Sequence, residues 1–355
     1  MSDQLGAAVL ERLISGVCGP EHARVLLGVI SIDAAALSAV KRENTVPRGV
    51  VAIALGVGLF ADLLDRVPTG RAYVDDVRAA GGHVTFDHGA LRTIRFPTGP
   101  TGAQPPGREA FARILEPLGY RQEGVYPLDR LKMTGYAYTH QDFPETAPQY
   151  FVSELHVDRF SSAFAAAAER VFGAVEESLG PEARRLLAAL AADDGCDEAV
   201  AAEGLPQLIA AFGRWRPPPL EEDYEILRAE SAEAAWIATE GSTFNHATDR
   251  VADVDALADA QRAKGRPIKD AVEVSSSGRV RQTAFKADPV RREFRRPDGS
   301  TRTRDVPGSF YEFITRDPLP DAERDAANGR RLDLRFDAAN AQGIFKMTSA
   351  DTEGA

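Results

Sequence analysis

The sequence predicts an α+β fold in which two copies of a βαβββ module form one curved, partly open, barrel-like sheet with added helical segments. Stretches rich in β-branched and aromatic residues alternate with stretches whose apolar residues recur at helical spacing. A short motif in the first β-rich stretch also returns 158 residues later. Such an internal repeat constrains the fold more firmly than local propensity does.

Residues 1–80 are predicted to form a helical N-terminal segment, because apolar residues recur every three or four positions in 9–17 and 55–64. Residues 81–160 are predicted to be the first module, with Gly119 ending its helix. The expected elements of this module are a strand at 84–94, a helix at 108–118, and strands near 120–128, 132–139 and 149–160.

Residues 161–240 are rich in Ala and Leu and are predicted to be a helical insertion. The second module is expected at 241–317, where the β-rich texture returns. Its expected elements are a strand at 242–251, a helix at 254–264 and three further extended stretches that close at 309–316. Residues 318–355 are expected to be a polar C-terminal extension, in which an apolar run at 343–347 is a candidate strand or lid.

The composition excludes several classes of protein. The chain has 42 Lys and Arg against 53 Asp and Glu, and its net charge of −11 argues against nucleic acid or an acidic membrane and favours a small-molecule or protein partner. Cys18 and Cys196 are too few for a disulfide scaffold or a thiolate zinc site and indicate a reducing compartment. The longest uncharged run, 49–61, has 13 residues, whereas a membrane helix needs about 20. Since no signal peptide is recognisable, we expect a cytoplasmic protein.

The repeated motif places one histidine in each module. It reads FDHGALR around His88 and FNHATDR around His246, so the two copies share F-[D/N]-H-x-x-x-R. The same displacement relates Glu154 to Glu312, and each glutamate follows the histidine of its module by 66 residues. Two copies of one module, each with a histidine on its first strand and a glutamate on its last, are the simplest account.

Strand geometry indicates the chemistry that these residues can support. Side chains two positions apart share a face of a strand, so Phe86, His88 and Arg92 are expected to point one way, as are His246 and its neighbours. If the modules pair about a pseudo-twofold axis, both histidines and the glutamates converge inside the sheet. Two imidazoles and one carboxylate on one side of an octahedron are the donor set of non-haem Fe(II) oxygenases. The alternative is that the histidines satisfy core hydrogen bonds and that Glu312 is a surface acid.

The duplicated plan resembles the vicinal oxygen chelate superfamily. The strings FDHGALR, SELHVDRF, FNHATDRV and PGSFYEFITR resemble the 2-oxoadipate dioxygenase/decarboxylase family, also called 2-hydroxyglutarate synthases, over about 45–345. The resemblance implies that His88, His246 and Glu312 bind Fe(II), and that Arg92 specifies the substrate. It also implies that one catalytic domain converts 2-oxoadipate and O₂ to 2-hydroxyglutarate and CO₂, a reaction of lysine degradation.

Further roles follow from this resemblance. The planar guanidinium of Arg92 suits a bidentate grip on the distal carboxylate of a 2-oxo dicarboxylic acid, although a structural ion pair is the alternative. Glu154 as a fourth ligand would leave too few open positions for a chelating substrate and O₂. Glu154 and His156 are therefore expected to support the metal ligands from the next layer, and Arg250 is expected to be structural.

Two rival functions stay open at this point. The same fold and ligands could serve a glyoxalase-type isomerase or a ring-cleaving dioxygenase. Duplicated modules can also bind ligands without a metal or catalysis, because a fold does not fix a function. The sequence makes no prediction of the oligomeric state.

Overall fold

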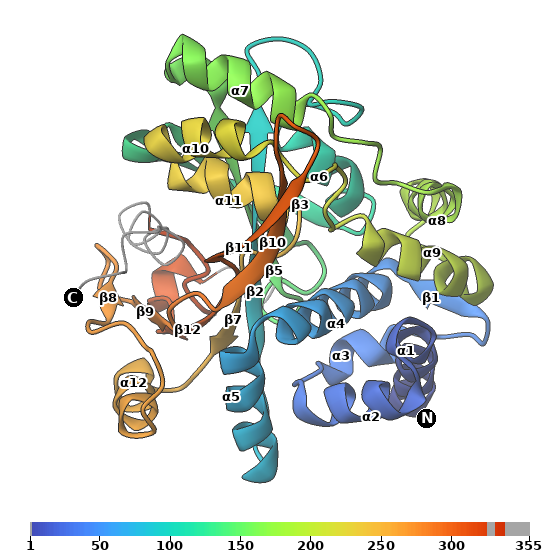
Figure 1. Ribbon diagram of the computed structural model, residues 1–355. Helices are drawn as coiled ribbons and strands as arrows, with labels where there is room; N and C mark the ends of the chain where they lie inside the picture. Colours follow the sequence, from blue (N-terminus) through green and yellow to red (C-terminus); the bar gives the residue numbers. More distant parts are fainter. Residues whose placement is uncertain (1, 325–330, 338–355) are drawn as a thin grey trace.

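An eight-stranded sheet occupies the centre of the protein (Figure 1). The computed structural model describes residues 2–324 and 331–337 of the chain. The strands in these ranges are β1 (Thr45–Pro47), β2 (Phe86–Arg95), β3 (Tyr120–Leu128), β4 (Met133–His140), β5 (Gln149–His156), β6 (Gly195–Asp197), β7 (His246–Arg250), β8 (Glu273–Val274), β9 (Val280–Ala284), β10 (Pro289–Arg295), β11 (Thr301–Pro307) and β12 (Phe310–Arg316). The main sheet has the order β3-β4-β5-β2-β7-β12-β9-β8, while β1 pairs with β6 and β10 pairs with β11.

The main sheet has pseudo-twofold symmetry. Its central strands, β2 and β7, are antiparallel, with Gly89 opposite Ala247 and the symmetric pairs His88–Thr248 and Ala90–His246 on either side. Each central strand has a parallel outer neighbour, β5 or β12, followed by antiparallel β4 and β3 on one side and β9 and β8 on the other. The duplicated α+β plan that the sequence predicted is therefore confirmed.

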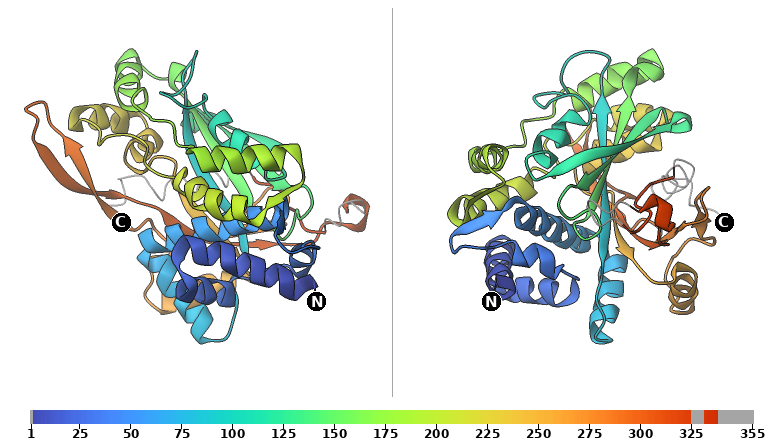
Figure 2. Two further views of the ribbon diagram at one scale, coloured as in Figure 1. Left: turned by 90° about the vertical axis from the view of Figure 1, so that its right-hand side faces the viewer. Right: turned by 180° about the vertical axis from the view of Figure 1, so that it is seen from behind.

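The second half of the sheet differs from the sequence prediction in one respect. The three extended stretches predicted after the helix at 254–264 are five strands, β8 to β12. Of these, β10 and β11 leave the main sheet as a separate ribbon (Figure 2, left view). This ribbon is anchored by Phe294, which packs on Tyr224 with ring centroids 4.8 Å apart. Local β propensity finds the strands but not the sheet to which each belongs.

Helices cover both faces of the sheet (Figures 1 and 2). They are α1 (Ser2–Cys18), α2 (Pro20–Val29), α3 (Ala34–Ser38), α4 (Arg48–Arg66), α5 (Pro68–Ala79), α6 (Glu109–Leu115), α7 (Ser162–Phe172), α8 (Pro181–Ala192), α9 (Glu198–Ala210), α10 (Glu221–Glu230), α11 (Ala232–Glu240) and α12 (Val254–Ala263). On one face, α1 to α6, α8, α9 and α12 form an apolar core with Tyr150 and Val152 of β5. On the other face, α7, α10 and α11 form a core with the alternate residues Phe151 and Leu155. Residues 161–240 thus contribute helices to both faces.

The uncharged run 49–61 lies within α4, where almost every residue is buried. A helix that is apolar on all sides belongs in a core, and α4 packs between the sheet and the N-terminal helices. No membrane-spanning helix is present among residues 2–324 and 331–337. The apolar run at 343–347 lies outside the described residues.

A β-bulge in β2 corrects one prediction about side-chain direction. The register shifts between Phe86 and His88, because Asp87 is an extra residue in the pairing with β7. Phe86 consequently packs on Phe60 of α4, with ring centroids 5.2 Å apart, rather than sharing the face of His88. Phe244 of the second motif also joins the core on the α4 side. Simple alternation was therefore wrong for these two phenylalanines.

Gly89 is expected to be indispensable at the pseudo-twofold axis. A Cβ at this position would lie 2.3 Å from the fully buried ring of Phe244, so Gly89→Ala should lower the free energy of unfolding by about 1–3 kcal/mol. Urea unfolding measures this change. Gly28→Ala is the matched control, because Gly28 lies within α2 and an added Cβ meets nothing within 4 Å. The control should instead be stabilised by about 0.5–1 kcal/mol, and equal losses in the two variants would contradict the steric argument.

Candidate metal centre

Three buried side chains converge on the sheet face that carries α7, α10 and α11. His88 lies on β2, His246 on β7 and Glu312 on β12, and one ligand atom from each lies within 4.8 Å of the others. The Nε2 atoms of His88 and His246 are 3.3 and 3.1 Å from Oε2 of Glu312. Their exposed fractions are only 3%, 6% and 1%.

The strand register accounts for this convergence. Glu312 is opposite Thr248 in the parallel pair of β12 and β7, and Thr248 is opposite His88 in the antiparallel pair of β7 and β2. Opposite residues have Cβ atoms about 5 Å apart on the same face. His246 is two residues before Thr248 and shares its face. The three groups therefore meet although Glu312 is far from both histidines in the sequence.

The residue before each histidine holds the imidazole in place. Oδ1 of Asp87 is 2.8 Å from Nδ1 of His88, and Oδ1 of Asn245 is 3.2 Å from Nδ1 of His246. With Nδ1 occupied in this way, each ring turns its Nε2 toward Glu312. A carboxylate or amide oxygen behind a metal-binding histidine fixes its tautomer and orientation.

Asp87 connects the centre to a buried arginine. Nε and Nη2 of Arg316 donate to its carboxylate at 2.9 Å, and both residues are buried. Burial alone would raise the pKa of Asp87, but Arg316 and His88 together hold that pKa well below its usual range. The anion is thus maintained behind His88.

The two histidines differ electrostatically. Burial alone would lower the pKa of His88, but its hydrogen bonds to Asp87 and Glu312 raise it above the ordinary value. Burial lowers the pKa of His246, where the attraction of Glu312 only partly opposes it. The neutral Asn245 offers His246 no charge comparable with that of Asp87. A single exchange in the repeated motif, Asp for Asn, accounts for this difference.

Glu312 is prepared to bind a cation. Burial opposes its ionisation, but His246 and His88 hold its pKa well below the usual range. Thr248 Oγ1 donates to Oε2 of Glu312 at 2.5 Å, whereas the buried Oε1 has no hydrogen-bond partner in the described residues. Two imidazole nitrogens and a carboxylate with an unsatisfied oxygen suit a divalent first-row metal. These residues therefore fit a metal ion.

The three candidate ligands line a cavity of about 450 Å³. Arg92 of β2 contributes to the same wall, together with Ser153, Gln282 and the aromatic rings of Phe151 and Phe336. The Arg92 guanidinium is buried and lies 5.0 Å from the ring centroid of Trp236. Burial lowers the pKa of Arg92 to about 10, with Glu233 opposing the shift. The cavity thus combines a metal-binding group with a cationic group.

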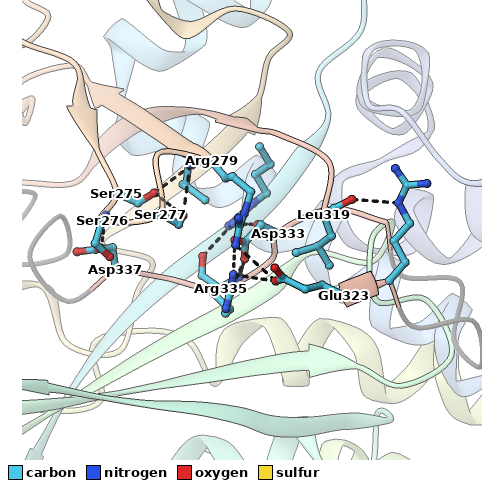
Figure 3. A network of polar contacts seen from close by, with 12 residues as sticks. Ser275, Ser276, Ser277, Arg279, Leu319, Glu323, Asp333, Arg335 and Asp337 are labelled. Atoms are coloured by element: carbon cyan, nitrogen blue, oxygen red, sulfur yellow. Dashed lines mark hydrogen bonds and ion pairs between the residues drawn. The ribbon is translucent and has the colours of Figure 1, made fainter. Parts of the chain in front are cut away.

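Residues 331–337 close one side of this cavity. Figure 3 shows how they are fastened: Asp333 pairs with Arg279 at 3.1 Å and Arg335 at 2.7 Å, and Asp337 accepts hydrogen bonds from Ser276. These contacts hold Phe336 against the centre. Its ring is edge-on to His88 with centroids 4.9 Å apart. A polar segment of the sequence therefore supplies the apolar cover of the site.

A comparison with protein families identifies the chain. The model of the 2-oxoadipate dioxygenase/decarboxylase family matches residues 69–328, which is more than half of the sequence. The chain belongs to this family.

Relatives within the family span monocots and bacteria. The 2-oxoadipate dioxygenase/decarboxylase of Oryza sativa subsp. japonica is 26% identical over 312 residues, which cover 81% of this chain and 76% of the rice protein. The Mycobacterium tuberculosis protein of the same name is 30% identical over 228 residues, which cover 60% of this chain and 53% of that protein. The match thus spans about half of the mycobacterial relative.

Solved structures share the fold of this 2-oxoadipate dioxygenase/decarboxylase family member. A glyoxalase superfamily protein from Ralstonia eutropha JMP134 has a TM-score of 0.85 and 50% identity, covering 93% of this chain and 98% of that one. The Oryza sativa hydroxyglutarate synthase, solved in complex with 2-oxoadipate, has a TM-score of 0.64 and 22% identity, covering 86% of this chain and 94% of that one. The likeness agrees with the predicted superfamily fold.

Glu154 and His156 do not reach the metal centre, and the prediction that they support it was wrong. Phe151, rather than Glu154, has the position in β5 that Glu312 has in β12, because Ala90 is opposite Phe151 as Thr248 is opposite Glu312. Glu154 is therefore on the other face of the sheet, where it accepts a hydrogen bond from the backbone N–H of Arg108 at 2.8 Å. Nε2 of His156 contacts Thr134 Oγ1 at 2.8 Å.

Several contributors to the site were not assigned from the sequence. Asp87 and Asn245 stand in the repeated motif directly before the histidines, so their recurrence was an available signal. Thr248 lies two residues after His246 on the same face and could have been found by strand alternation. Phe336 had no such signal, because it reaches the site from a charged segment outside both modules.

Glu312→Gln is expected to reduce Fe²⁺ affinity by more than about 10-fold, because an amide oxygen is a weaker ligand than a carboxylate. Anaerobic titration calorimetry measures this affinity. Glu154→Gln is the matched control, since it removes a buried carboxylate of the same sheet but on the opposite face. Equal losses from the two substitutions would argue that Glu312 is not a ligand.

Asp87→Asn should lower the free energy of unfolding by about 3 kcal/mol, because it leaves the buried Arg316 cation without its anion. Chemical unfolding measures the change. Asp305→Asn removes an anion from an exposed pair with Arg291 and should have no measurable effect. A stable Asp87→Asn protein would show that Arg316 does not depend on this carboxylate.

Proposed function

We propose that this protein is an Fe(II)-dependent enzyme that converts 2-oxoadipate and O₂ to 2-hydroxyglutarate and CO₂. The observation that carries the proposal is the placement of His88, His246 and Glu312 in one closed cavity with Arg92. The family membership supports the same reaction. The atoms of 2-oxoadipate and O₂ balance those of the two products, so no second oxo acid is required.

The donor set favours iron and an oxygenase over an isomerase. His88, His246 and Glu312 would occupy one side of an octahedron and leave the other positions for a bidentate 2-oxo acid and O₂. A glyoxalase-type site with four protein ligands would need a further donor. The position symmetric to Glu312 holds Phe151, so the first module offers no second carboxylate there. Ferrous iron would supply the one-electron chemistry that activates O₂.

The protein side chains would each contribute a defined part of the reaction. Asp87 keeps the Nδ1–H of His88 engaged, so that the Nε2 lone pair faces the metal. Arg92 would receive the distal carboxylate of the chelated substrate and thereby fix which carbon faces the oxidant. Phe151 and Phe336 surround the centre with apolar surface and exclude water from it.

The charge of the protein makes this local arrangement necessary. The whole chain carries a net charge of −11 and repels a dianionic substrate at long range. Arg92 and a divalent metal ion would supply the positive charge where the substrate binds. We place the reaction in lysine degradation and in the cytoplasm, a reducing compartment that agrees with two cysteines that are both free.

The reaction can be tested directly. Protein loaded anaerobically with Fe²⁺ is expected to consume O₂ and 2-oxoadipate in equimolar amounts and to release equimolar CO₂ and 2-hydroxyglutarate. Removal of iron with a chelator should abolish CO₂ release, and added Fe²⁺ should restore it. Oxygen electrode traces and mass spectrometry of the products measure both results.

The same experiment separates the rival functions. Conversion of substrate without O₂ consumption would identify an isomerase. Tight ligand binding that persists in His246→Ala and in metal-free protein would identify a binding protein. An iron-replete protein that releases no CO₂ from 2-oxoadipate would overturn the proposed substrate.

A further inference from the structure

A second cavity adjoins the metal centre at Arg92. It has a volume of about 390 Å³ and lies beside the part of β2 that extends beyond its pairing with β7. Its wall includes Phe172 at the end of α7, Ile237 of α11 and Arg216 from the connection between α9 and α10. Arg92 also lines this cavity, so one guanidinium borders both spaces.

Arg216 presents a buried cation to the second cavity. Its chain is partly exposed, but its Nη2 is fully buried and has no hydrogen-bond partner in the described residues. Its Nε donates to the carbonyl oxygen of Ala238 at 3.3 Å, and its guanidinium lies 5.3 Å from the ring centroid of Phe172. These contacts orient the side chain but do not neutralise its charge.

No described carboxylate lines the second cavity. The nearest acid that acts on Arg216 is Glu240, and both of its oxygens accept hydrogen bonds from Arg292, at 2.8 and 2.6 Å. Glu233, which acts on Arg92, accepts a hydrogen bond from Ser231. Burial lowers the pKa of Arg216 to about 10, as it does for Arg92. A buried cation is costly unless an anion accompanies it.

We propose that the second cavity is an anion subsite in which Arg216, together with Arg92, binds the substrate carboxylate that lies farthest from the metal. This inference rests on the proposed function and adds to it a second specificity-determining residue, contributed by the helical insertion. Arg92 is four residues from His88, about 13 Å along an extended strand. The subsite therefore lies in the direction in which a chelated 2-oxo dicarboxylate extends. Two guanidiniums select a dianionic 2-oxo acid over a monoanionic one of equal length.

The test compares two ligands that differ only in the far carboxylate, 2-oxoadipate and 2-oxohexanoate. Their affinities are measured by anaerobic titration calorimetry on Fe²⁺-loaded protein. Arg216→Gln is expected to weaken 2-oxoadipate binding by about 10- to 100-fold, the usual loss for a charge-assisted hydrogen bond. Binding of 2-oxohexanoate should not change. Arg216→Lys should retain part of the preference, which excludes a general folding defect.

Arg214→Gln is the matched control. Arg214 is exposed in the same connection and lines a neighbouring outer pocket, but not the proposed subsite. This variant should retain the wild-type preference for 2-oxoadipate. An unchanged preference in Arg216→Gln, or an equal loss in Arg214→Gln, would overturn the proposal.

A metal-free measurement separates the subsite from the reaction. Sulfate should raise the unfolding temperature of metal-free wild-type protein more than that of Arg216→Gln. If wild-type protein binds neither oxo acid but shows this sulfate effect, the proposed function fails while the anion subsite stands. An equal sulfate effect in the two proteins would overturn the subsite even if 2-oxoadipate is turned over.

Discussion

The register of β2 against β7 is the constraint on which the metal centre depends. With Gly89 opposite Ala247, the two histidines become symmetric about one point of the sheet. A slip of one residue would turn the side chains of one strand to the other face. Neither histidine would then lie near Glu312. The close approach of Phe244 to Gly89 fills the axis from the α4 side and permits only this fit.

Charge around the centre is balanced with similar economy. Glu312 and Asp87 are two buried anions, and Arg316 compensates one of them. A divalent ion would leave the group with a single positive charge, and Arg92 would raise this to two. That value matches a dianionic substrate. An aspartate at the position of Asn245 would remove half of it, so the neutral residue of the second motif is the appropriate partner for His246.

The sequence was sufficient for the duplicated fold and for the three residues that the structure brings together, because both histidines lie on the symmetric central strands. It failed for Glu154, since a constant displacement of 158 residues does not extend to β5 and β12. The segments between β2 and β5 and between β7 and β12 differ by three residues in length, as the pairing of Phe151 shows. The bulge at Asp87 and the contact of Phe336 were also unpredictable, because each depends on pairing or packing between distant segments.

The placement of residues 161–240 between the two modules also affects how the protein folds. The first module can assemble from local contacts, but β2 then presents one bare edge until β7 is made, long after β5. During that interval, unpaired N–H and C=O groups are exposed to other chains. Pairings this distant in sequence form slowly. The intervening helices pack on both faces of the half-sheet as synthesis proceeds, so the insertion that supplies Arg216 also acts as an internal chaperone for the unfinished sheet.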